Sequence, residues 1–446
     1  MASPHDNYAR PPRAPRPTTH DRDADGIDRR GFLECMAWAG TGLLWTMRGG
    51  VPRASALGAL DAMSAADTAG VFFAQVSDSH IGFDKAANTD VTATLQAAVD
   101  RLNALPRRPA LVLHTGDISQ LSKPSEFDTA DQVLRGLRTE RVCFVPGEHD
   151  VLGDNGASYL ARYGRALGAR GGGWYSFDHS GVHFVGLVNV LNLKAGGLGS
   201  LGAEQLAWLA DDVRGLAAST PIVLFAHVPL WTVYPEWGWG TDDAAQALAL
   251  LRRFGSVTVL NGHIHQIMQK VEGNVRFHTA MSTAFPQPAP GAAPAPGPMT
   301  VDPGLLTRVL GVTDVRYVAG RHALAVVDDA TLSGAPPAFA EANRRAAERV
   351  RQDAGRAGAP PAPNQVAIDN FAFTPRTLAV AAGAEVTWVN HDDVPHTIVS
   401  VEQAFPGSPV LDTGRTYRAR LARPGTYRYF CSIHPTMTGT LVVAAP

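Results

Sequence analysis

Five short polar blocks hold most of the residues in this chain that could bind metal ions. In chain order they are Asp78-Ser79-His80, Gly116-Asp117, Gly147-Glu148-His149-Asp150, His227 and Gly262-His263-Ile264-His265. Their side chains are imidazoles and carboxylates without a thiolate, a set that suits zinc, iron, manganese or cobalt and argues against a structural cysteine-type zinc site. The ligands are numerous enough for two metal ions.

The elements that must position these blocks can be predicted from hydrophobic patterns. Each block follows an apolar run that predicts a strand, at residues 71–76, 110–113, 141–145, 222–225 and 257–260. Apolar residues at helical spacing predict amphipathic helices over residues 91–105, 127–137 and 201–216. We therefore expect an α/β domain, a mixed β-sandwich with outer helices, which gathers the ligands at the carboxyl ends of its strands.

These blocks resemble, in order and spacing, those of the calcineurin-like metallophosphoesterases. The resemblance covers residues 71–332, and it includes an expected hairpin that turns at Ser180-Gly181 and the helix that begins near Leu201. It implies a four-layer α/β/β/α sandwich with a dinuclear metal site. The implied metal ligands are Asp78, His80 and His265 for one ion, His227 and His263 for the other, and Asp117 as the bridge between them.

The same resemblance implies the reaction. His149 would protonate the leaving alkoxide or stabilise phosphate charge, and Asp150 would orient it. Two cations about 3.5–4 Å apart would clamp the attacking and leaving oxygens and convert a bridging water to hydroxide. The chain would thus hydrolyse phosphomonoesters or phosphodiesters by metal-bridged hydroxide attack.

One position departs from the family pattern. The third block of the family normally has Asn as a ligand of the second metal ion, and this chain has Glu148. A carboxylate about 4 Å from a phosphate oxygen raises the barrier by up to ~4 kcal/mol at an effective dielectric constant of about 20, or about three decades of rate. Glu148 would ligate a more highly charged pair such as Fe(III)–M(II), shift the substrate preference, or mark a site that has lost activity.

A second set of ligands lies near the C-terminus. Cys431, His434 and Met437 follow an expected strand at residues 426–430, and His396 lies upstream. Two His, one Cys and a weak axial Met form the ligand set of blue-copper sites. Residues 364–446 resemble a small cupredoxin of the amicyanin or plastocyanin type, which implies a Greek-key β-sandwich with one copper ion. Its strands are expected at residues 368–373, 385–390, 397–401, 416–421 and 440–443.

The N-terminal segment resembles a twin-arginine export signal. Arg29-Arg30, a weakly apolar run at residues 35–47 and Ala54-Ser55-Ala56 occur in that order. We expect a periplasmic protein that is cleaved near Ala56 and has no membrane span, since the apolar run is too short to cross a bilayer. The expected regions are the tail and signal at 1–56, the metallophosphoesterase domain at 70–332, a helical and Pro-rich linker at 333–363, and the cupredoxin domain at 364–446.

Composition limits the classes of partner. The formal net charge is −2, which gives no electrostatic argument for nucleic acid. Of the three cysteines, Cys143 lies within an expected strand and should be a buried apolar residue. Trp231, Tyr234, Trp237 and Trp239 follow His227 closely, and they would either line a substrate pocket or pack a lid loop.

The sequence therefore predicts an exported phosphoester hydrolase with two ions of iron, manganese or zinc, a copper-binding domain and a small phosphate ester as substrate. The copper domain would allow a redox partner protein, or would change the oxidation state of an iron in the hydrolase site. The alternative is a periplasmic copper-binding or electron-transfer protein whose phosphoesterase-like domain is inactive. Glu148 favours this alternative, and the intact set of remaining ligands favours the enzyme.

Overall fold

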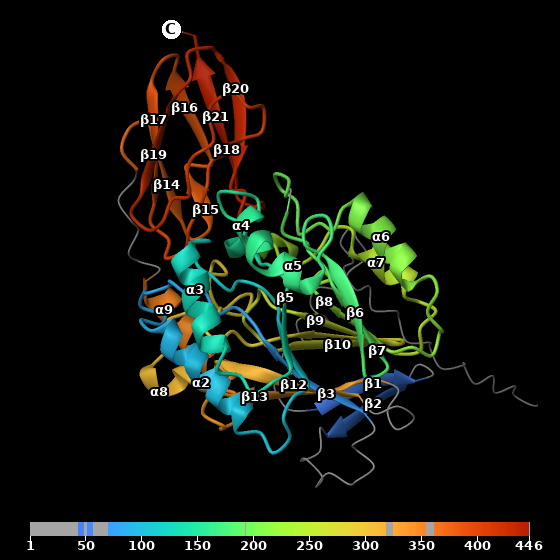
Figure 1. Ribbon diagram of the computed structural model, residues 1–446. Helices are drawn as coiled ribbons and strands as arrows, with labels where there is room; N and C mark the ends of the chain where they lie inside the picture. Colours follow the sequence, from blue (N-terminus) through green and yellow to red (C-terminus); the bar gives the residue numbers. More distant parts are fainter. Residues whose placement is uncertain are drawn as a thin grey trace, which may run out of the picture.

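The computed structural model describes residues 43–48, 51–56, 70–191, 193–317, 324–353 and 361–445. These residues form an α/β domain and an all-β C-terminal domain that stands on it as a separate lobe (Figure 1). Most of the segment expected to be an export signal lies outside the described residues. Within that segment, β1 (Leu43–Arg48) and β2 (Val51–Ala56) pair as an antiparallel hairpin.

Two sheets pack face to face in the α/β domain. The first has the strand order β13-β12-β3-β4-β5, with strands Val326–Thr331, Gly311–Tyr317, Val71–Val76, Leu111–His114 and Arg141–Phe144. The second has the order β10-β11-β9-β8-β7-β6, with strands Met268–Glu272, Val275–Thr279, Val257–Asn261, Ile222–Phe225, Val182–Gly186 and Tyr175–His179. Phe73 on β3 meets Phe184 on β7 with ring centroids 5.2 Å apart, so the two sheets share one core.

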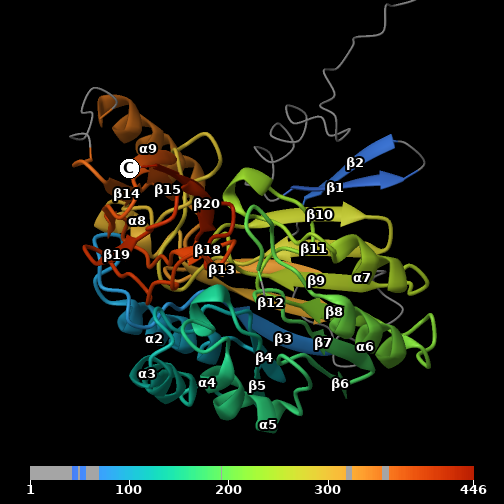
Figure 2. The same ribbon diagram turned by 90° about the horizontal axis from the view of Figure 1, so that it is seen from above.

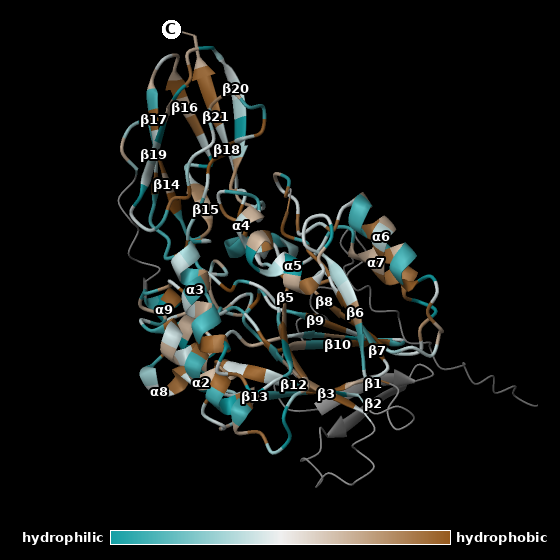
Figure 3. Ribbon diagram, in the orientation of Figure 1, coloured by the Kyte–Doolittle hydropathy of each residue, from teal (hydrophilic) through white to brown (hydrophobic). Residues whose placement is uncertain are grey.

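Helices cover the outer face of each sheet. On the first sheet, α2 (Val91–Asn103) and α3 (Pro124–Leu134) bury Leu95 and Phe127 in the shared core. On the second, α6 (Ala203–Val213) and α7 (Ala244–Leu250) bury Leu209 and Ala247 against the strands (Figure 2). Hydrophilic and hydrophobic residues alternate along α2, α3 and α6, as expected for helices with one buried face (Figure 3). The predicted α/β sandwich is confirmed.

Shorter helices complete this domain. Ala157–Tyr159 (α4) and Arg165–Leu167 (α5) follow the third ligand block, and Pro303–Leu306 (α8) follows the proline-rich loop at residues 286–298. The helical part of the linker expected at residues 333–363 is α9 (Phe339–Asp353). It packs Ala342 into a small cluster with Met299 and Leu305, so it rests on the α/β domain. No helix among the described residues is long and apolar enough to cross a membrane.

A buried histidine joins the edge hairpin of the second sheet to α6. His183 on β7 contacts Asp178 through Nδ1 at 2.8 Å and Asp212 through Nε2 at 2.9 Å. Burial alone would lower the pKa of His183, but the hydrogen bonds to Asp212 and Asp178 outweigh it and raise this pKa above its ordinary value. The ring is therefore held in its charged form, which can donate from both nitrogens.

This ion pair predicts a pH dependence of stability. Because the pKa of His183 is higher in the folded chain, its contribution is complete below about pH 6.5 and is lost as pH rises through the folded pKa. Replacing His183 with Gln should lower the free energy of unfolding by about 1–2 kcal/mol at pH 6 and by less at pH 9. Urea unfolding at both pH values measures this difference. An equal loss at both values would contradict the charged form.

The C-terminal domain is a sandwich of two sheets. One has the order β15-β14-β17-β19, with strands Ala372–Thr374, Gln365–Asp369, Glu385–Asn390 and Thr416–Arg420. The other has the order β16-β21-β20-β18, with strands Thr377–Ala381, Thr438–Ala444, Gly425–Phe430 and Val399–Ser400. Trp388 and Tyr429 are buried between them with ring centroids 5.4 Å apart. The β-sandwich predicted for the C-terminal domain is confirmed.

One predicted strand of this domain is wrong. Residues 368–373 were expected to run as one strand, but Asn370 and Phe371 have φ of 53° and 55° and separate β14 from β15. The carboxylate of Asp392 accepts hydrogen bonds from both of their backbone N–H groups, at 2.6 and 3.0 Å, and holds this turn. The contact is remote in sequence, so the apolar pattern of the segment could not reveal the break.

The two domains touch at the end of the C-terminal domain that carries Cys431. Leu152 of the α/β domain packs against the core cluster of the C-terminal domain. The N–H of Gly196 donates a hydrogen bond to the carbonyl of Pro435 at 2.6 Å. The second set of predicted ligands therefore faces the first domain.

Candidate metal centres

The predicted ligands of the α/β domain converge on one place, just beyond the carboxyl ends of their strands. Asp78 and His80 follow β3, Asp117 follows β4, Glu148 follows β5, His227 follows β8, and His263 and His265 follow β9. The ligand atoms of Asp78, His80 and His265 all lie within 4.8 Å of one another, as do those of Glu148, His227 and His263. The two groups match the two metal positions that the sequence predicts, with Glu148 in the second.

Asp117 lies between the two groups. Its Oδ2 atom is 3.5 Å from Nε2 of His80 and 3.3 Å from Nε2 of His227. One carboxylate oxygen thus faces a ligand of each group, which is the position that a bridging ligand requires. Its other oxygen accepts a hydrogen bond from the N–H of His149 at 2.9 Å, and this bond fixes the carboxylate.

The donor atoms have the features of a metal site. Oδ2 of Asp78, Oε2 of Glu148, Nε2 of His227 and Nδ1 of His263 are buried without a hydrogen-bond partner. Nε2 of His227 approaches Oε2 of Glu148 to 2.9 Å, yet the pair lacks hydrogen-bond geometry. Buried polar atoms in this state are costly, and cations between them would satisfy them. The residues present therefore fit two metal ions.

Hydrogen bonds on the far side of the rings set which nitrogen faces the site. Nδ1 of His80 contacts Oε1 of Gln120 at 2.9 Å, Nδ1 of His227 contacts the carbonyl of Thr115 at 2.8 Å, and Nδ1 of His265 contacts the carbonyl of Phe285 at 2.6 Å. An Nδ1–H donor leaves Nε2 free as a ligand. Gln120 was not predicted from the sequence, because a glutamine three residues after a metal ligand gives no signal by itself.

Burial and charge also prepare the ligands. Burial lowers the pKa of His80 to about 3, so this ring is neutral and able to bind a metal ion. Burial would raise the pKa of Glu148, but His263 and His227 hold it well below its ordinary value, so the carboxylate is charged. Burial would lower the pKa of His227, yet the carboxylates of Asp117 and Glu148 raise it well above the usual range. The raised pKa of His227 reflects the negative charge at the second metal position, which a cation would neutralise.

The ligands sit on an unusual backbone. Asp78, His80, Asp117, His263 and His265 have positive φ angles of 40° to 70°. Each such non-glycine residue costs about 1 kcal/mol or more, and the strain persists only where surrounding contacts hold it. Among these contacts, the N–H of His263 donates to Oδ1 of Asp78 at 3.0 Å.

Gly147, in the third block, must be a glycine because there is no room for a side chain at this position. A Cβ atom at Gly147 would overlap with Oδ1 and the backbone nitrogen of Asp117. Close approach of the two loops therefore explains why Gly147 precedes Glu148.

The predicted role of Asp150 needs correction. Nδ1 of His149 faces the carbonyl of Gln120 at 2.8 Å. The carboxylate of Asp150 instead accepts hydrogen bonds from the N–H groups of Ile118 at 3.0 Å, Ser119 at 2.8 Å and Gly147 at 3.0 Å. Asp150 therefore ties the loop after β5 to the loop after β4, and a backbone carbonyl orients the His149 ring. The sequence could not show this, because any residue can supply a carbonyl.

The predicted copper ligands also meet. Sγ of Cys431 lies 3.7 Å from Nδ1 of His396 and 3.8 Å from Nδ1 of His434, and the two nitrogens are 3.3 Å apart. These atoms form a triangle of the size that a three-coordinate metal ion needs at about 2.0–2.3 Å from each ligand. Met437 is buried in the same core cluster. The donor set fits one copper ion.

The groups around Cys431 and His396 favour the forms of these side chains that can bind copper. Burial would raise the pKa of Cys431, but His396 and His434 lower it well below its usual range, toward the thiolate. The N–H groups of Thr397 and His434 each approach the sulfur at 3.4 Å. Nε2 of His396 contacts Oδ2 of Asp392 at 2.9 Å, which directs Nδ1 at the metal position. Asp392 was not predicted from the sequence.

Replacing Cys431 with Ser tests the copper assignment. Copper-loaded protein should show an intense visible absorption band from the copper–thiolate bond, and the variant should lose this band, since an alcohol does not supply the thiolate. Absorption spectroscopy after copper titration measures it. Cys143→Ser is the matched control, because Cys143 is buried in β5 away from both ligand groups. A band that persists in Cys431→Ser, or vanishes in Cys143→Ser, would contradict the assignment.

A small cavity of about 30 Å³ separates the two sets of ligands. Its wall on one side includes Glu148, His149 and His263 of the α/β domain, and on the other Phe371, Val394 and His434 of the C-terminal domain. The rest includes Gln287, Pro296 and Pro298 of the proline-rich loop, together with Trp237 and Trp239. All four aromatic residues after His227 pack in or against the core cluster of the second sheet, including Trp231 and Tyr234. Two of them, Trp237 and Trp239, therefore line the pocket as well as packing in this core.

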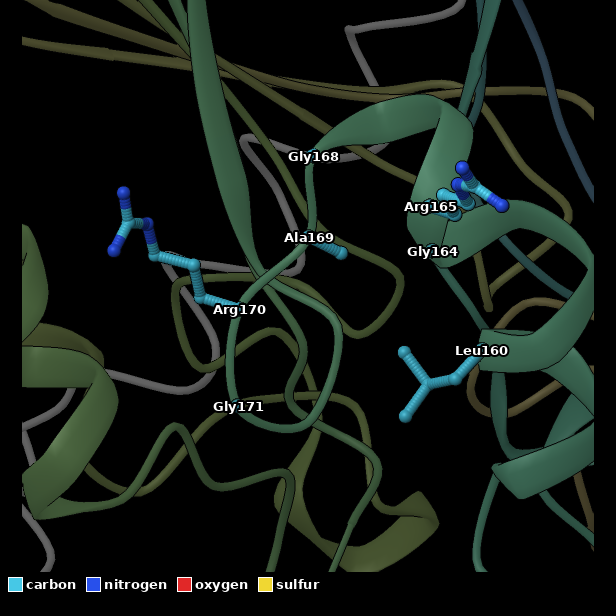
Figure 4. Close-up of a pocket in the computed structure, with 7 residues that line it drawn as sticks. All are labelled: Leu160, Gly164, Arg165, Gly168, Ala169, Arg170 and Gly171. Carbon is cyan, nitrogen blue, oxygen red and sulfur yellow. The ribbon is translucent and has the colours of Figure 1, made fainter.

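A second hollow lies on the surface of the α/β domain (Figure 4). It is lined by Leu160, Gly164, Arg165, Gly168, Ala169, Arg170 and Gly171. The side chains of Arg165 and Arg170 lie on opposite sides of it and do not converge (Figure 4). It holds none of the predicted site residues, so the ligand clusters remain the candidate site.

Comparisons with known proteins agree with this geometry. Residues 73–267 match the family model described as calcineurin-like phosphoesterase, and residues 350–443 match the cupredoxin-like domain. The C-terminal part is 36% identical over 90 residues to amicyanin-alpha of Methylorubrum extorquens, a match that covers 19% of this chain and 75% of that protein.

The N-terminal part is similar to two proteins named as phosphodiesterases. It is 25% identical over 222 residues to a 3',5'-cyclic-nucleotide phosphodiesterase of Nostoc sp., covering 48% of this chain and 79% of that protein. It is 28% identical over 214 residues to a glycerophosphodiester phosphodiesterase of Enterobacter lignolyticus, covering 44% of this chain and 72% of that protein.

Proposed function

Because this chain belongs to the calcineurin-like phosphoesterases through residues 73–267 and carries a cupredoxin-like domain at residues 350–443, we propose that it is a metal-dependent phosphodiester hydrolase with a copper-binding domain. The observation that carries the proposal is the set of buried, unpartnered ligand atoms of Asp78, Glu148, His227 and His263 around Asp117. Export to the periplasm, through the N-terminal segment, is part of the same proposal.

The chain's own residues take defined parts in the reaction. Two metal ions in this site would supply Lewis-acid charge and an activated water. Asp117, fixed by the N–H of His149, lies between the two ligand groups and keeps the distance between them constant. His149 lines the cavity, and its Nδ1 is bound to the carbonyl of Gln120, so Nε2 is the atom that can give a proton to the leaving oxygen.

The charge of Glu148 favours diesters over monoesters. A phosphodiester carries one negative charge near neutral pH and a monoester carries up to two, so the Coulomb repulsion from an added carboxylate is about twice as large for the monoester. Both hydrolase relatives are named as phosphodiesterases, which supports the same choice. We therefore infer that the substitution of Asn by Glu148 selects a monoanionic ester.

The size of the cavity adds a requirement for substrate entry. About 30 Å³ accommodates only a few water molecules, whereas pockets for organic ligands have about 300 Å³ or more. An ester therefore reaches the metal ions when the C-terminal domain or the loop at residues 286–298 moves away from His149.

The test is hydrolysis of bis-para-nitrophenyl phosphate and para-nitrophenyl phosphate with Mn, Fe, Zn or Co supplied separately. Loss of a general acid should lower kcat of His149→Ala by about 10²–10⁴-fold. His179→Ala, at the end of β6 outside the site, is the matched control. Equal rates in wild type and His149→Ala would overturn the assignment of His149.

The same experiment decides between the two functional classes. The alternative, a copper-binding or electron-transfer protein with an inactive phosphoesterase-like domain, is favoured by Glu148 in the place of Asn. No turnover with any of the four metals, in protein that still binds copper, would establish this alternative. Faster cleavage of the diester than of the monoester would support the phosphodiesterase.

A further inference from the structure

One residue of the copper triangle also belongs to the wall of the hydrolase site. Nδ1 of His434 faces Cys431 and His396. The same ring lies 6.3 Å from the ring of His149, centroid to centroid. Ligand atoms of Glu148, His149 and His434 all lie within 4.8 Å of one another. The path from the copper position to the second metal position therefore crosses the imidazole of His434, a short gap and the carboxylate of Glu148.

The packing around His434 closes this end of the copper domain. The ring of Phe371 contacts the rings of both copper histidines, at 5.4 Å from His396 and 4.8 Å from His434. Beyond them, the hydrogen bond from Gly196 to Pro435 holds the ligand loop on the α/β domain. His434 is half-buried in this arrangement, and the hydrolase site already touches it.

We propose that the copper centre exchanges single electrons with a redox-active metal ion, such as iron, in the hydrolase site of the same chain, across the contact of His434 with Glu148 and His149. One electron leaves Cu(I), which becomes Cu(II), and reduces Fe(III) to Fe(II). No covalent bond forms or breaks, and no proton is needed because the total charge of the pair is unchanged. The proposal rests on metal occupancy of the two sites and not on hydrolysis.

The composition of the hydrolase site suits such an ion. Imidazole and carboxylate ligands bind iron as well as zinc. The ligands Asp78, Asp117 and Glu148 carry three carboxylates, one more than the family pattern with Asn would supply. An added negative charge stabilises the trivalent state relative to the divalent state. Glu148, the departure from the family pattern, is also a predicted hydrolase ligand that shares a cluster with the copper ligand His434.

The experiment compares iron and zinc in the hydrolase site of the full chain with copper bound. Pulse reduction of Cu(II) in the Fe(III)-loaded protein bleaches the visible band. The band should then recover in a first-order process whose rate does not depend on protein concentration. Anaerobic addition of Fe(II) to the Cu(II) protein tests the reverse direction by bleaching. Electron transfer must be favourable in one direction, so the absence of any change of the band in both experiments would overturn the proposal. Equal recovery of the band with redox-inert zinc would overturn it too.

Variants separate the domain contact from the copper site itself. Leu152→Asp places a charge in the contact between the domains, and it should slow the exchange at least tenfold with an unchanged visible band. Val350→Asp makes the same kind of change at an exposed position on α9 and should leave the rate unaltered. Equal rates in both variants would contradict transfer through this contact.

Hydrolysis measured on the zinc-loaded protein distinguishes a failure of the redox inference from a failure of the proposed hydrolase function. Ester cleavage without electron exchange in the iron-loaded protein would remove only the redox inference. Electron exchange without ester cleavage under any metal would remove only the hydrolase.

Discussion

Replacing Asp117 with Ala is expected to lower kcat for phosphodiester hydrolysis by at least about a thousandfold. Oδ2 of Asp117 faces a ligand of each metal group, His80 at 3.5 Å and His227 at 3.3 Å. A metal site contributes several kcal/mol of charge stabilisation to the transition state, and about 4 kcal/mol is three decades of rate. The variant should also bind less metal, because the negative charge that holds both ions is gone.

Steady-state kinetics with bis-para-nitrophenyl phosphate and elemental analysis of the same samples measure both effects. Asp100→Ala is the matched control, since Asp100 is an exposed aspartate on α2 that accepts a hydrogen bond only from a neighbouring side chain of its own helix. Full metal content together with full activity in Asp117→Ala would show that this carboxylate does not bridge the ions. Full metal content with low activity would limit its role to positioning.

Replacing Glu148 with Asn is expected to raise monoester hydrolysis by up to about a thousandfold, with a smaller rise for diesters. The change removes a negative charge next to the second metal position, where Oε1 and Oε2 of Glu148 lie 2.8 Å from His263 and 2.9 Å from His227. Up to ~4 kcal/mol of repulsion toward a phosphate oxygen would disappear. The ratio of the two ester activities, measured at equal metal content, reports the effect.

Glu148→Gln is the companion variant, since it removes the charge and keeps the length of the side chain. A rise in both variants would assign the effect to charge. If both lose metal and activity, Glu148 is needed as a charged ligand, and the reading of a more highly charged metal pair would be supported instead. An unchanged ratio of ester activities would contradict the proposed preference for diesters.

Local patterns were enough to predict the site because each ligand comes directly after a strand. The strand at residues 71–76 has the predicted bounds, and the strand before Asp117 is shifted by one residue. The strands before Glu148 and His263 differ from the prediction by one residue at the C-terminal end. Buried strands with continuous apolar residues give a strong signal, and polar residues at their ends are then confined to one edge of the sheet. The seven residues predicted as hydrolase ligands and the three predicted copper ligands therefore come together in the structure, as their places after the strands suggested.

Contacts that depend on the path of the chain in space could not be predicted. Gln120 and the carbonyl of Phe285 orient His80 and His265, yet neither has a local pattern that indicates a site. The largest omission is the contact of His149 with His434, because it depends on how two separately folded domains dock. Hydrophobic periodicity describes how each domain forms and contains no information on their relative placement.

The positive φ angles at five predicted ligands bear on why these residues are kept. The five are Asp78, His80, Asp117, His263 and His265. Glycine, or in part asparagine, would relax each of these turns, so a chain without use for metal ions would gain stability by losing the ligands. Most random changes are filtered for stability alone where no activity is under selection. Five such side chains are costly to keep for stability alone, which supports the proposal that they bind metal ions beside Glu148.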